Sequence, residues 1–280
     1  MMESVHRQFR QVDVFAEEPF VGNPVAVVHG ADGLTDDEMR LFARWTNLSE
    51  TTFLLPPTDE RADYRVRIFT PGQELPFAGH PTLGTAHAWL EAGGPPARRD
   101  VIVQECAVGL VTLRRTSQGL AFKAPPTTHG GPVDEPTLAE VADVLRIDRA
   151  DIVDAQWADN GPGWVAVELA SAEAVLKVRP GLTERKIGVF GRCPAGSAEA
   201  IEVRAFFSAG AGTLEDPVTG SLNASLAQWL LASGKIAAPY AARQGTVLGR
   251  RGRVHVSADA DGAVWIGGGT HTLISGSVLL

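Results

Sequence analysis

The sequence has only two cysteines among 280 residues, Cys106 and Cys193. Two thiols cannot form a disulfide framework and are too few for a structural zinc site. Cys106 falls in an apolar strand pattern, where cysteine acts more often as a small buried residue than as a nucleophile. The seven histidines show no metal-ligand spacing. We therefore expect no metal centre.

Long apolar runs and targeting signals are also missing. The first 15 residues lack the apolar core of a secretory signal. The stretch 262–280 has no Asp, Glu, Lys or Arg, but three consecutive glycines at 267–269 interrupt it, which indicates strands and turns. We expect a cytoplasmic protein without a membrane span.

Several signatures of function are absent too. No Walker motif, G-x-G-x-x-G, H-E-x-x-H or G-x-S-x-G pattern occurs, so no nucleotide loop, zinc-protease helix or serine-nucleophile elbow is indicated. The net charge of −8 argues against nucleic acid or an anionic membrane as the main partner. A small acidic substrate remains compatible, because a cleft can be locally positive on an acidic protein.

An internal sequence repeat is the most informative feature present. Within 74–85, His80-Pro81 matches Asp216-Pro217, and Gly84-Thr85 matches Gly220-Ser221. Further matches follow in the same order at an offset of about 140 residues, such as RIFT at 67–70 with RAFF at 204–207. Repeated matches at one offset predict two similar domains with a cleft between them.

The expected elements support an α+β fold. Strands are predicted at 9–15, 24–28, 51–55 and 64–69, and near Ile152, Val165, Ile187, Ile201, Thr246, Val254 and Val264. Thr35 with Glu38 predicts a capping box, and Thr137 with Glu140 repeats that spacing. Two helices, over 82–90 and from about Ser221, are apolar nearly all round. Such helices must be buried on every side, and a curved sheet wrapped around each would bury them.

The residues at the two helix starts are candidates for binding. His80 and Asp216 each precede a proline, which favours extended backbone just outside a helix. The backbone N–H groups that follow, together with the helix dipole, form an anion site. Gly84-Thr85 and Gly220-Ser221 allow close approach and add a hydroxyl. The alternative is that both are simple helix corners.

Glu50 is the candidate proton carrier. It lies between an apolar helix and the apolar strand 51–55, where desolvation raises the pKa of a carboxyl toward the range useful for proton transfer. The alternatives are a surface glutamate or a capping partner of Ser49. Glu74 and Glu215 also lie just before the helix corners, and Glu215 could equally be a solvated neighbour of Asp216.

Four motifs in order resemble the PhzF family, which is related to diaminopimelate epimerase: VDVF with PFVGNP over 12–24, NLSETTF over 47–53, ELPFAGHPTLG over 74–84 and EDPVTGS over 215–221. The resemblance implies two pseudo-symmetric domains, each a mixed β-sheet around a central helix. We expect an N-terminal lobe of 1–124, to which strand 270–280 returns, and a C-terminal lobe of 125–269. It also implies a homodimer and chemistry without a cofactor.

By resemblance, Glu50 is the catalytic acid/base, and His80 and Asp216 are catalytic residues. We expect the substrate-binding residues to be Ser221, Gly79, Gly84, Thr85, Gly220 and Thr219. The implied activity is that of trans-2,3-dihydro-3-hydroxyanthranilate isomerase, a proton shift on a small, cyclic carboxylate.

Two alternatives remain at this point. One is an amino-acid racemase or epimerase without pyridoxal phosphate, with His80 and Asp216 as its two bases. The two-thiol mechanism of the epimerase relatives is disfavoured, because Cys106 and Cys193 lie away from the helix corners. The other alternative is a non-catalytic protein that binds a small molecule or a protein.

Overall fold

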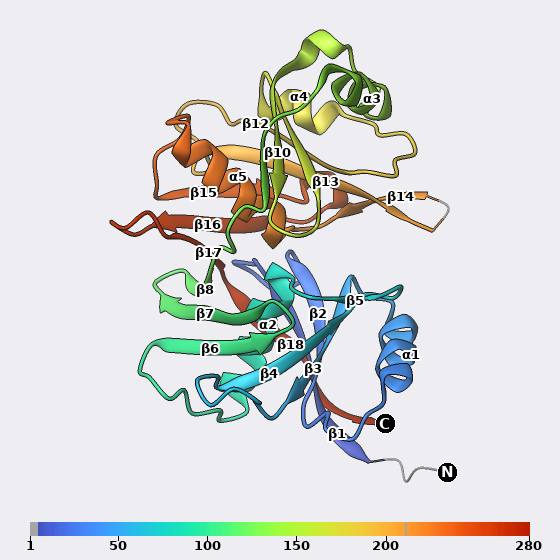
Figure 1. Cartoon of the computed structure of the whole chain (residues 1–280), viewed down its shortest axis with the longest axis vertical. Coiled ribbons are helices and arrows are strands. Elements are labelled where there is room, and N and C mark those ends of the chain that lie inside the picture. Colours follow the sequence, from blue (N-terminus) through green and yellow to red (C-terminus); the bar gives the residue numbers. More distant parts are fainter. Residues whose placement is uncertain (1–4, 211) are drawn as a thin grey trace. The chain divides into compact units, whose positions relative to one another are not determined.

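The computed structural model describes residues 5–210 and 212–280, so residues 1–4 of the expected N-terminal lobe lie outside the described part. Within these ranges the chain forms five α-helices, two short 3-10 helices and 18 strands, a mixed α+β fold (Figure 1). The chain divides into two compact units. Unit 1 comprises Met1–Lys123 and Gly267–Leu280, and unit 2 comprises Ala124–Ile266.

Unit 1 is a mixed sheet with two helices. Its elements are β1 (His6–Val14), β2 (Asn23–Val28), α1 (Asp36–Thr46), β3 (Glu50–Leu55), β4 (Tyr64–Phe69), β5 (Glu74–Leu75), α2 (Gly79–Glu91), β6 (Val101–Cys106), β7 (Gly109–Thr116), β8 (Gly119–Lys123) and β18 (Thr270–Leu279). Strand β1 is antiparallel to β18 and β2, whereas β2 and β3 run parallel. Strand β4 is antiparallel to β3 and parallel to β6.

Unit 2 contains the remaining elements: β9 (His129–Pro132), α3 (Glu135–Leu145), η1 (Arg149–Asp151), β10 (Ile152–Asp159), β11 (Trp164–Leu169), α4 (Ala172–Lys177), β12 (Lys186–Arg192), β13 (Ile201–Ala209), β14 (Gly212–Asp216), α5 (Gly220–Ala232), β15 (Tyr240–Gln244), η2 (Thr246–Leu248), β16 (Gly252–Ala258) and the start of β17 (Val264–Gly268). Strands β11 and β12 run parallel, and β13 is antiparallel to both β12 and β14. Parallel and antiparallel pairs therefore occur in both units.

Helices α2 and α5 are buried, as their apolar sequences predict. Each has 13 residues, and in each helix the first turn and most of the following residues are buried. In unit 1, α2 packs against β1, β2, β3 and β8. In unit 2, α5 packs against β10 and β16. Burial on several sides removes the polar face that a surface helix needs.

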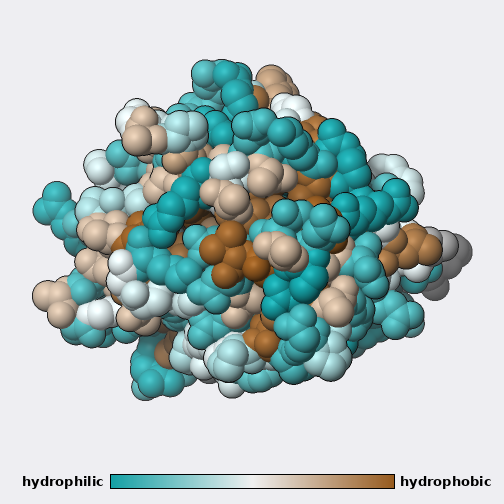
Figure 2. All heavy atoms as spheres, turned by 90° about the horizontal axis from the view of Figure 1, so that it is seen from above, coloured by the Kyte–Doolittle hydropathy of each residue, from teal (hydrophilic) through white to brown (hydrophobic). Residues whose placement is uncertain are grey.

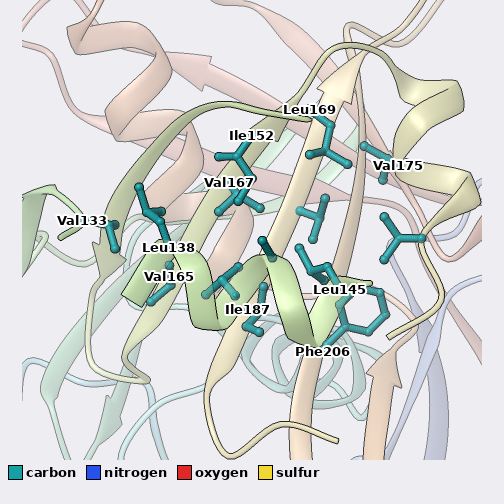
Figure 3. Packing of buried hydrophobic residues seen from close by; sticks show 14 residues of the cluster. Val133, Leu138, Leu145, Ile152, Val165, Val167, Leu169, Val175, Ile187 and Phe206 are labelled. Carbon is teal, nitrogen blue, oxygen red and sulfur yellow. The ribbon is translucent and has the colours of Figure 1, made fainter. Parts of the chain in front are cut away.

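Unit 2 has a second layer of apolar packing between helix α3 and the strands (Figure 3). Leu138, Val141 and Leu145 recur at helical spacing on one face of α3. They pack with Val165 of β11 and Ile187 of β12 in one buried cluster. This layer holds the parallel pair β11–β12, from which part of the candidate site below is built.

Three predicted boundaries are wrong. Helix α2 begins at Gly79, before Thr82. Asp134, not Thr137, caps α3, because its carboxylate accepts from the Thr137 backbone N–H. Thr246 lies in the 3-10 helix η2 instead of a strand, since Gly245 and Gly249 on either side adopt positive φ. The capping box of Thr35 and Glu38 at α1 is confirmed.

The face drawn in Figure 2 is mainly hydrophilic, with smaller hydrophobic patches between the polar side chains. None of the described helices combines the length and apolar character required to cross a membrane.

Candidate functional site

In unit 1, two neighbouring parallel strands and a helix start converge. Asn23 is the first residue of β2 and Glu50 the first of β3, and Val25 lies opposite Glu50 in the pairing. His80 is the second residue of α2. Its Nε2 atom lies 3.2 Å from Oε2 of Glu50, and only 4% and 15% of the two side chains are exposed. Glu50 is thus neither a surface glutamate nor remote from His80.

The other side of the His80 ring faces the start of β2. Nδ2 of Asn23 lies 3.4 Å from Nδ1 of His80, and Asn23 is fully buried. Asp13 holds the preceding turn, because its carboxylate accepts hydrogen bonds from the backbone N–H groups of Val21 and Gly22. A Cβ atom on Gly22 would lie 2.2 Å from the Val14 carbonyl oxygen, so only glycine allows this close approach.

Burial controls the charge of His80. Desolvation lowers the pKa of His80 to about 3, against the smaller opposing effect of a hydrogen bond with the Pro24 backbone. The imidazole is therefore neutral at neutral pH. A neutral ring has one nitrogen that donates and one that accepts. The pair of Glu50 and His80 can accordingly hold and pass on a single proton.

The low pKa of His80 predicts loss of stability in mild acid. The pKa of a histidine in the unfolded chain is 6.5, whereas the pKa of His80 in the folded protein is about 3. Between these two pH values the unfolded state binds more protons than the folded state. The contribution of neutral His80 to the free energy of unfolding is therefore complete above pH 6.5 and is lost as the pH falls from 6.5 toward 3. Urea unfolding should show a loss of about 2 kcal/mol between pH 7 and pH 5 from this residue.

The variant His80→Gln should show a shallower pH dependence over that interval. His6→Gln, at an exposed position on β1, is the matched control and should keep the wild-type slope. Equal slopes in the His80 variant and the wild type would contradict the assignment of a neutral buried imidazole.

In unit 2, a polar network surrounds the start of α5. Asp216 ends β14, and its Oδ2 accepts a 2.6 Å hydrogen bond from the hydroxyl of Thr219, the N-cap residue. Gln244 of β15 accepts from the Thr219 backbone N–H at 3.0 Å and donates to the Asp216 carbonyl at 3.1 Å. Asn223 donates to Gln244 at 2.9 Å. Gln244 therefore joins the end of β14 to the start of α5.

Ser221 is held from two further elements. The indole Nε1 of Trp164, at the start of β11, donates to the Ser221 hydroxyl oxygen at 3.1 Å. The Nδ2 atom of Asn160 donates to the Ser221 carbonyl at 3.0 Å. All three residues are buried. The Ser221 hydroxyl thus has a defined donor on one side.

Two of the expected binding residues have packing roles. A Cβ atom on Gly84 would lie 2.3 Å from Cγ1 of Val25, so this glycine lets α2 approach β2. The hydroxyl of Thr85 donates to that of Thr52 at 2.8 Å, and both residues are buried. Gly79 and Gly220, in contrast, are the first residues of α2 and α5. We leave Gly84 and Thr85 out of the proposed site.

The structure also corrects the alignment of the two halves of the internal sequence repeat. His80 does not lie in extended backbone outside the helix, as the following proline predicts, but is the second residue of α2. The second residue of α5 is Ser221, whereas Asp216 lies outside that helix, in β14. By position at a helix start, His80 therefore corresponds to Ser221 and not to Asp216.

Glu74 and Glu215 form ion pairs. Glu74 accepts two hydrogen bonds from Arg67, and Glu215 accepts two from Arg204. Only 10% of the Glu215 side chain is exposed, so the interpretation of Glu215 as a solvated neighbour of Asp216 is wrong.

Each unit therefore assembles its own group of candidates. Unit 1 brings together Glu50, His80 and Gly79, and unit 2 brings together the helix-start residues with Asp216. Four neighbours in these groups were not predicted as site residues: Asn23, Asn160, Trp164 and Gln244. Within the described residues, no group of three or more His, Cys, Asp or Glu side chains is arranged to hold a metal ion.

The chain is similar to known proteins along nearly its whole length. It is 35% identical over 261 residues to trans-2,3-dihydro-3-hydroxyanthranilate isomerase of Pseudomonas aeruginosa, which covers 90% of each chain. It is 35% identical over 292 residues to antisense-enhancing sequence 1 of Schizosaccharomyces pombe, covering 96% of this chain and 97% of the relative. The crystal structure of the Bacillus anthracis phenazine biosynthesis protein of the PhzF family has the same fold, with a TM-score of 0.83, 24% identity and coverage of 99% and 100%.

The fold and these relatives define the class of the protein, which is an isomerase. Residues 12–276 match the PhzC-PhzF family, described as phenazine biosynthesis-like protein. The chain belongs to this family, and the resemblance that its motifs carry is confirmed.

Proposed function

We propose that the chain catalyses a cofactor-independent isomerisation in which Glu50 moves a proton on a small, cyclic, carboxylate-bearing substrate. The observation that carries this proposal is the 3.2 Å approach of Glu50 Oε2 to His80 Nε2, with both side chains largely buried. A single carboxylate can remove a proton from one carbon and return it to another, so no second base is required.

His80 positions and tunes Glu50 in this proposal. Because burial keeps the imidazole neutral, it can donate a hydrogen bond to the carboxylate or accept one from the carboxylic acid. Both protonation states of Glu50 are thus supported in turn. Asp216 is the second candidate for proton transfer, and the hydroxyl of Thr219 donates a 2.6 Å hydrogen bond to its carboxylate.

The start of α5 is the proposed site for the substrate carboxylate. Thr219, Gly220 and Ser221 begin a helix of 13 residues, whose first backbone N–H groups and dipole favour an anion. Gly79 begins α2 in the same way. The substrate class follows from the name of the Pseudomonas relative, which describes a ring that carries a carboxylate.

We also propose that the two units arose by duplication, each as a mixed sheet around its central helix, in the manner of diaminopimelate epimerase. Support comes from matched contacts inside each unit. The ion pair of Arg67 with Glu74 has its counterpart in that of Arg204 with Glu215. Each arginine also lies over a phenylalanine ring two residues later, at 5.1 and 4.8 Å.

Matched contacts also occur at the central helices α2 and α5. Gln104 donates to Thr82, the fourth residue of α2, and Gln244 accepts from Asn223, the fourth residue of α5. In this proposal the working protein is a cytoplasmic homodimer. Light scattering of the purified protein tests the dimer.

The activity is tested by incubating the protein in D₂O with trans-2,3-dihydro-3-hydroxyanthranilate and related cyclic carboxylates. We expect an isomer that carries deuterium on a ring carbon, detected by mass spectrometry and NMR, because the proton that Glu50 has removed can exchange with solvent before it is returned to the second carbon. Heat-denatured protein is the control. Deuterium at the α-carbon during inversion of an amino acid would instead assign a racemase.

The two-thiol racemase mechanism has less support. The second helix positions of α2 and α5 carry His80 and Ser221, whereas Cys106 ends β6 and Cys193 follows β12. Binding of a protein partner without conversion or exchange of any tested compound would overturn the isomerase proposal in favour of a non-catalytic role.

A further inference from the structure

The side-chain amide of Asn160 makes a hydrogen bond through its nitrogen, whereas its oxygen makes none with the described residues. Asn160 is 8% exposed, and its Nδ2 donates to the Ser221 carbonyl in the first turn of α5. Its Oδ1 is buried and has no hydrogen-bond partner in the described part of the structure. Buried carbonyl oxygens in native proteins are rarely left without a donor.

The orientation of this amide is determined by its neighbour. The Ser221 backbone oxygen can only accept, so the amide must turn its N–H group toward it. The acceptor oxygen of Asn160 is consequently the atom that remains available. Because the described residues supply no donor there, an N–H or O–H group of a bound molecule would satisfy this oxygen.

The Ser221 hydroxyl beside it has the opposite character. Its oxygen already accepts from the Trp164 indole, a pure donor that is itself 4% exposed. The hydroxyl proton therefore points elsewhere and can be donated. A donor, Ser221 Oγ–H, and an acceptor, Asn160 Oδ1, are thus available on two residues that a hydrogen bond joins at the start of α5.

We propose that Asn160 determines substrate specificity by accepting a hydrogen bond from an N–H or O–H group on the substrate ring, whose carboxylate accepts from Ser221 and the first amides of α5. This inference rests on the proposed function and adds to it a second polar group on the substrate. It assigns Trp164 the role of orienting the Ser221 hydroxyl.

Matched pairs of benzoates test the inference by isothermal titration calorimetry. The compounds 2-aminobenzoate and 2-methylbenzoate are similar in size, but only the first carries an N–H donor on the substituent, and 3-hydroxybenzoate and 3-methylbenzoate are paired in the same way for an O–H donor. The wild type should bind the donor member of at least one pair about fivefold more tightly. The pair that shows the preference identifies whether the donor is nitrogen or oxygen.

Three variants locate the source of that preference. Asn160→Leu should bind both members of the pair equally, whereas Asn160→Gln, which keeps an amide with both an N–H donor and an acceptor oxygen, should retain the preference. Trp164→Phe removes the indole N–H, so it should weaken both members alike by about fivefold and leave their ratio unchanged. Ratios within one variant cancel general losses of affinity or folded fraction.

The outcomes are distinguishable. Equal binding of both members of each pair by the wild type, or a preference that survives in Asn160→Leu, overturns the role of Asn160 while the carboxylate site stands. Loss of the preference in both Asn160 variants also overturns it. Failure of the wild type to bind any of the four benzoates overturns the proposed carboxylate site together with this inference.

Discussion

Glu50→Gln is expected to lower kcat by roughly 10²- to 10⁴-fold, the contribution typical of a positioned general acid or base. The amide has nearly the shape of the carboxyl group, but it cannot take up or release a proton at neutral pH. Its neighbour His80 lies 3.2 Å away in a largely buried setting, so water cannot readily replace the missing base. The variant should also lose deuterium incorporation from D₂O.

The measurement compares initial rates and deuterium uptake for the compound that the wild type converts. Glu60→Gln makes the same chemical change at an exposed position of unit 1 and should keep wild-type activity. Thermal unfolding of both variants checks that the fold survives. Full turnover by the Glu50 variant would remove this residue from the mechanism, while an equal loss in both variants would point to a general effect.

The sequence led to Glu50 and His80 because each lies in a contiguous motif. Glu50 precedes an apolar strand directly, and this local pattern places it at the start of β3. The helices α2 and α5 could likewise be expected, since both are apolar nearly all round and both are buried. Features that depend only on adjacent residues in the sequence could therefore be predicted.

The remaining parts of the site depend on contacts between distant segments. Trp164 meets Ser221 across 57 positions, and Gln244 meets Thr219 across 25. Asn23 lies 57 positions from His80, and only the parallel pairing of β2 with β3 brings its strand beside Glu50. Asn23 lies within a motif, but no local pattern shows that it, Trp164 or Gln244 contacts the site, because these contacts form only when distant segments meet.

The starts of α2 and α5 show a second limit of prediction from the sequence. Proline disfavours helical backbone in the residue before it, which predicts an extended His80. Pro81 instead occupies the first turn of α2, where its missing N–H costs nothing, because the first N–H groups of a helix have no partner within it. The rule holds at Asp216, which ends strand β14 before Pro217. The residue before proline is thus helical at His80 and in a strand at Asp216.

Arg204→Met should destabilise the protein by about 3–5 kcal/mol, because it leaves a buried carboxylate without its partner. The Arg204 side chain is 2% exposed and that of Glu215 is 10% exposed. The guanidinium also donates to the carbonyls of Val175 and Val178 at 3.1 and 2.7 Å. Methionine retains much of the apolar stem but supplies none of these hydrogen bonds.

The corresponding pair in unit 1 is the internal control. Arg67 makes the same two-pronged contact with Glu74, but their side chains are 25% and 32% exposed, so water can solvate the carboxylate that remains. Arg67→Met should therefore cost about 1 kcal/mol. Urea unfolding of the two variants measures the difference, and equal losses would contradict burial as its cause.

A second substitution separates the buried charge from lost packing. If the unpaired Glu215 carboxylate causes most of the loss in Arg204→Met, adding Glu215→Gln should restore about 1–3 kcal/mol, because the double variant no longer buries an isolated charge. Adding Glu74→Gln to Arg67→Met should change stability much less. If the two double variants recover equally, the Arg204 effect comes from its packing and carbonyl contacts and not from the charge of Glu215.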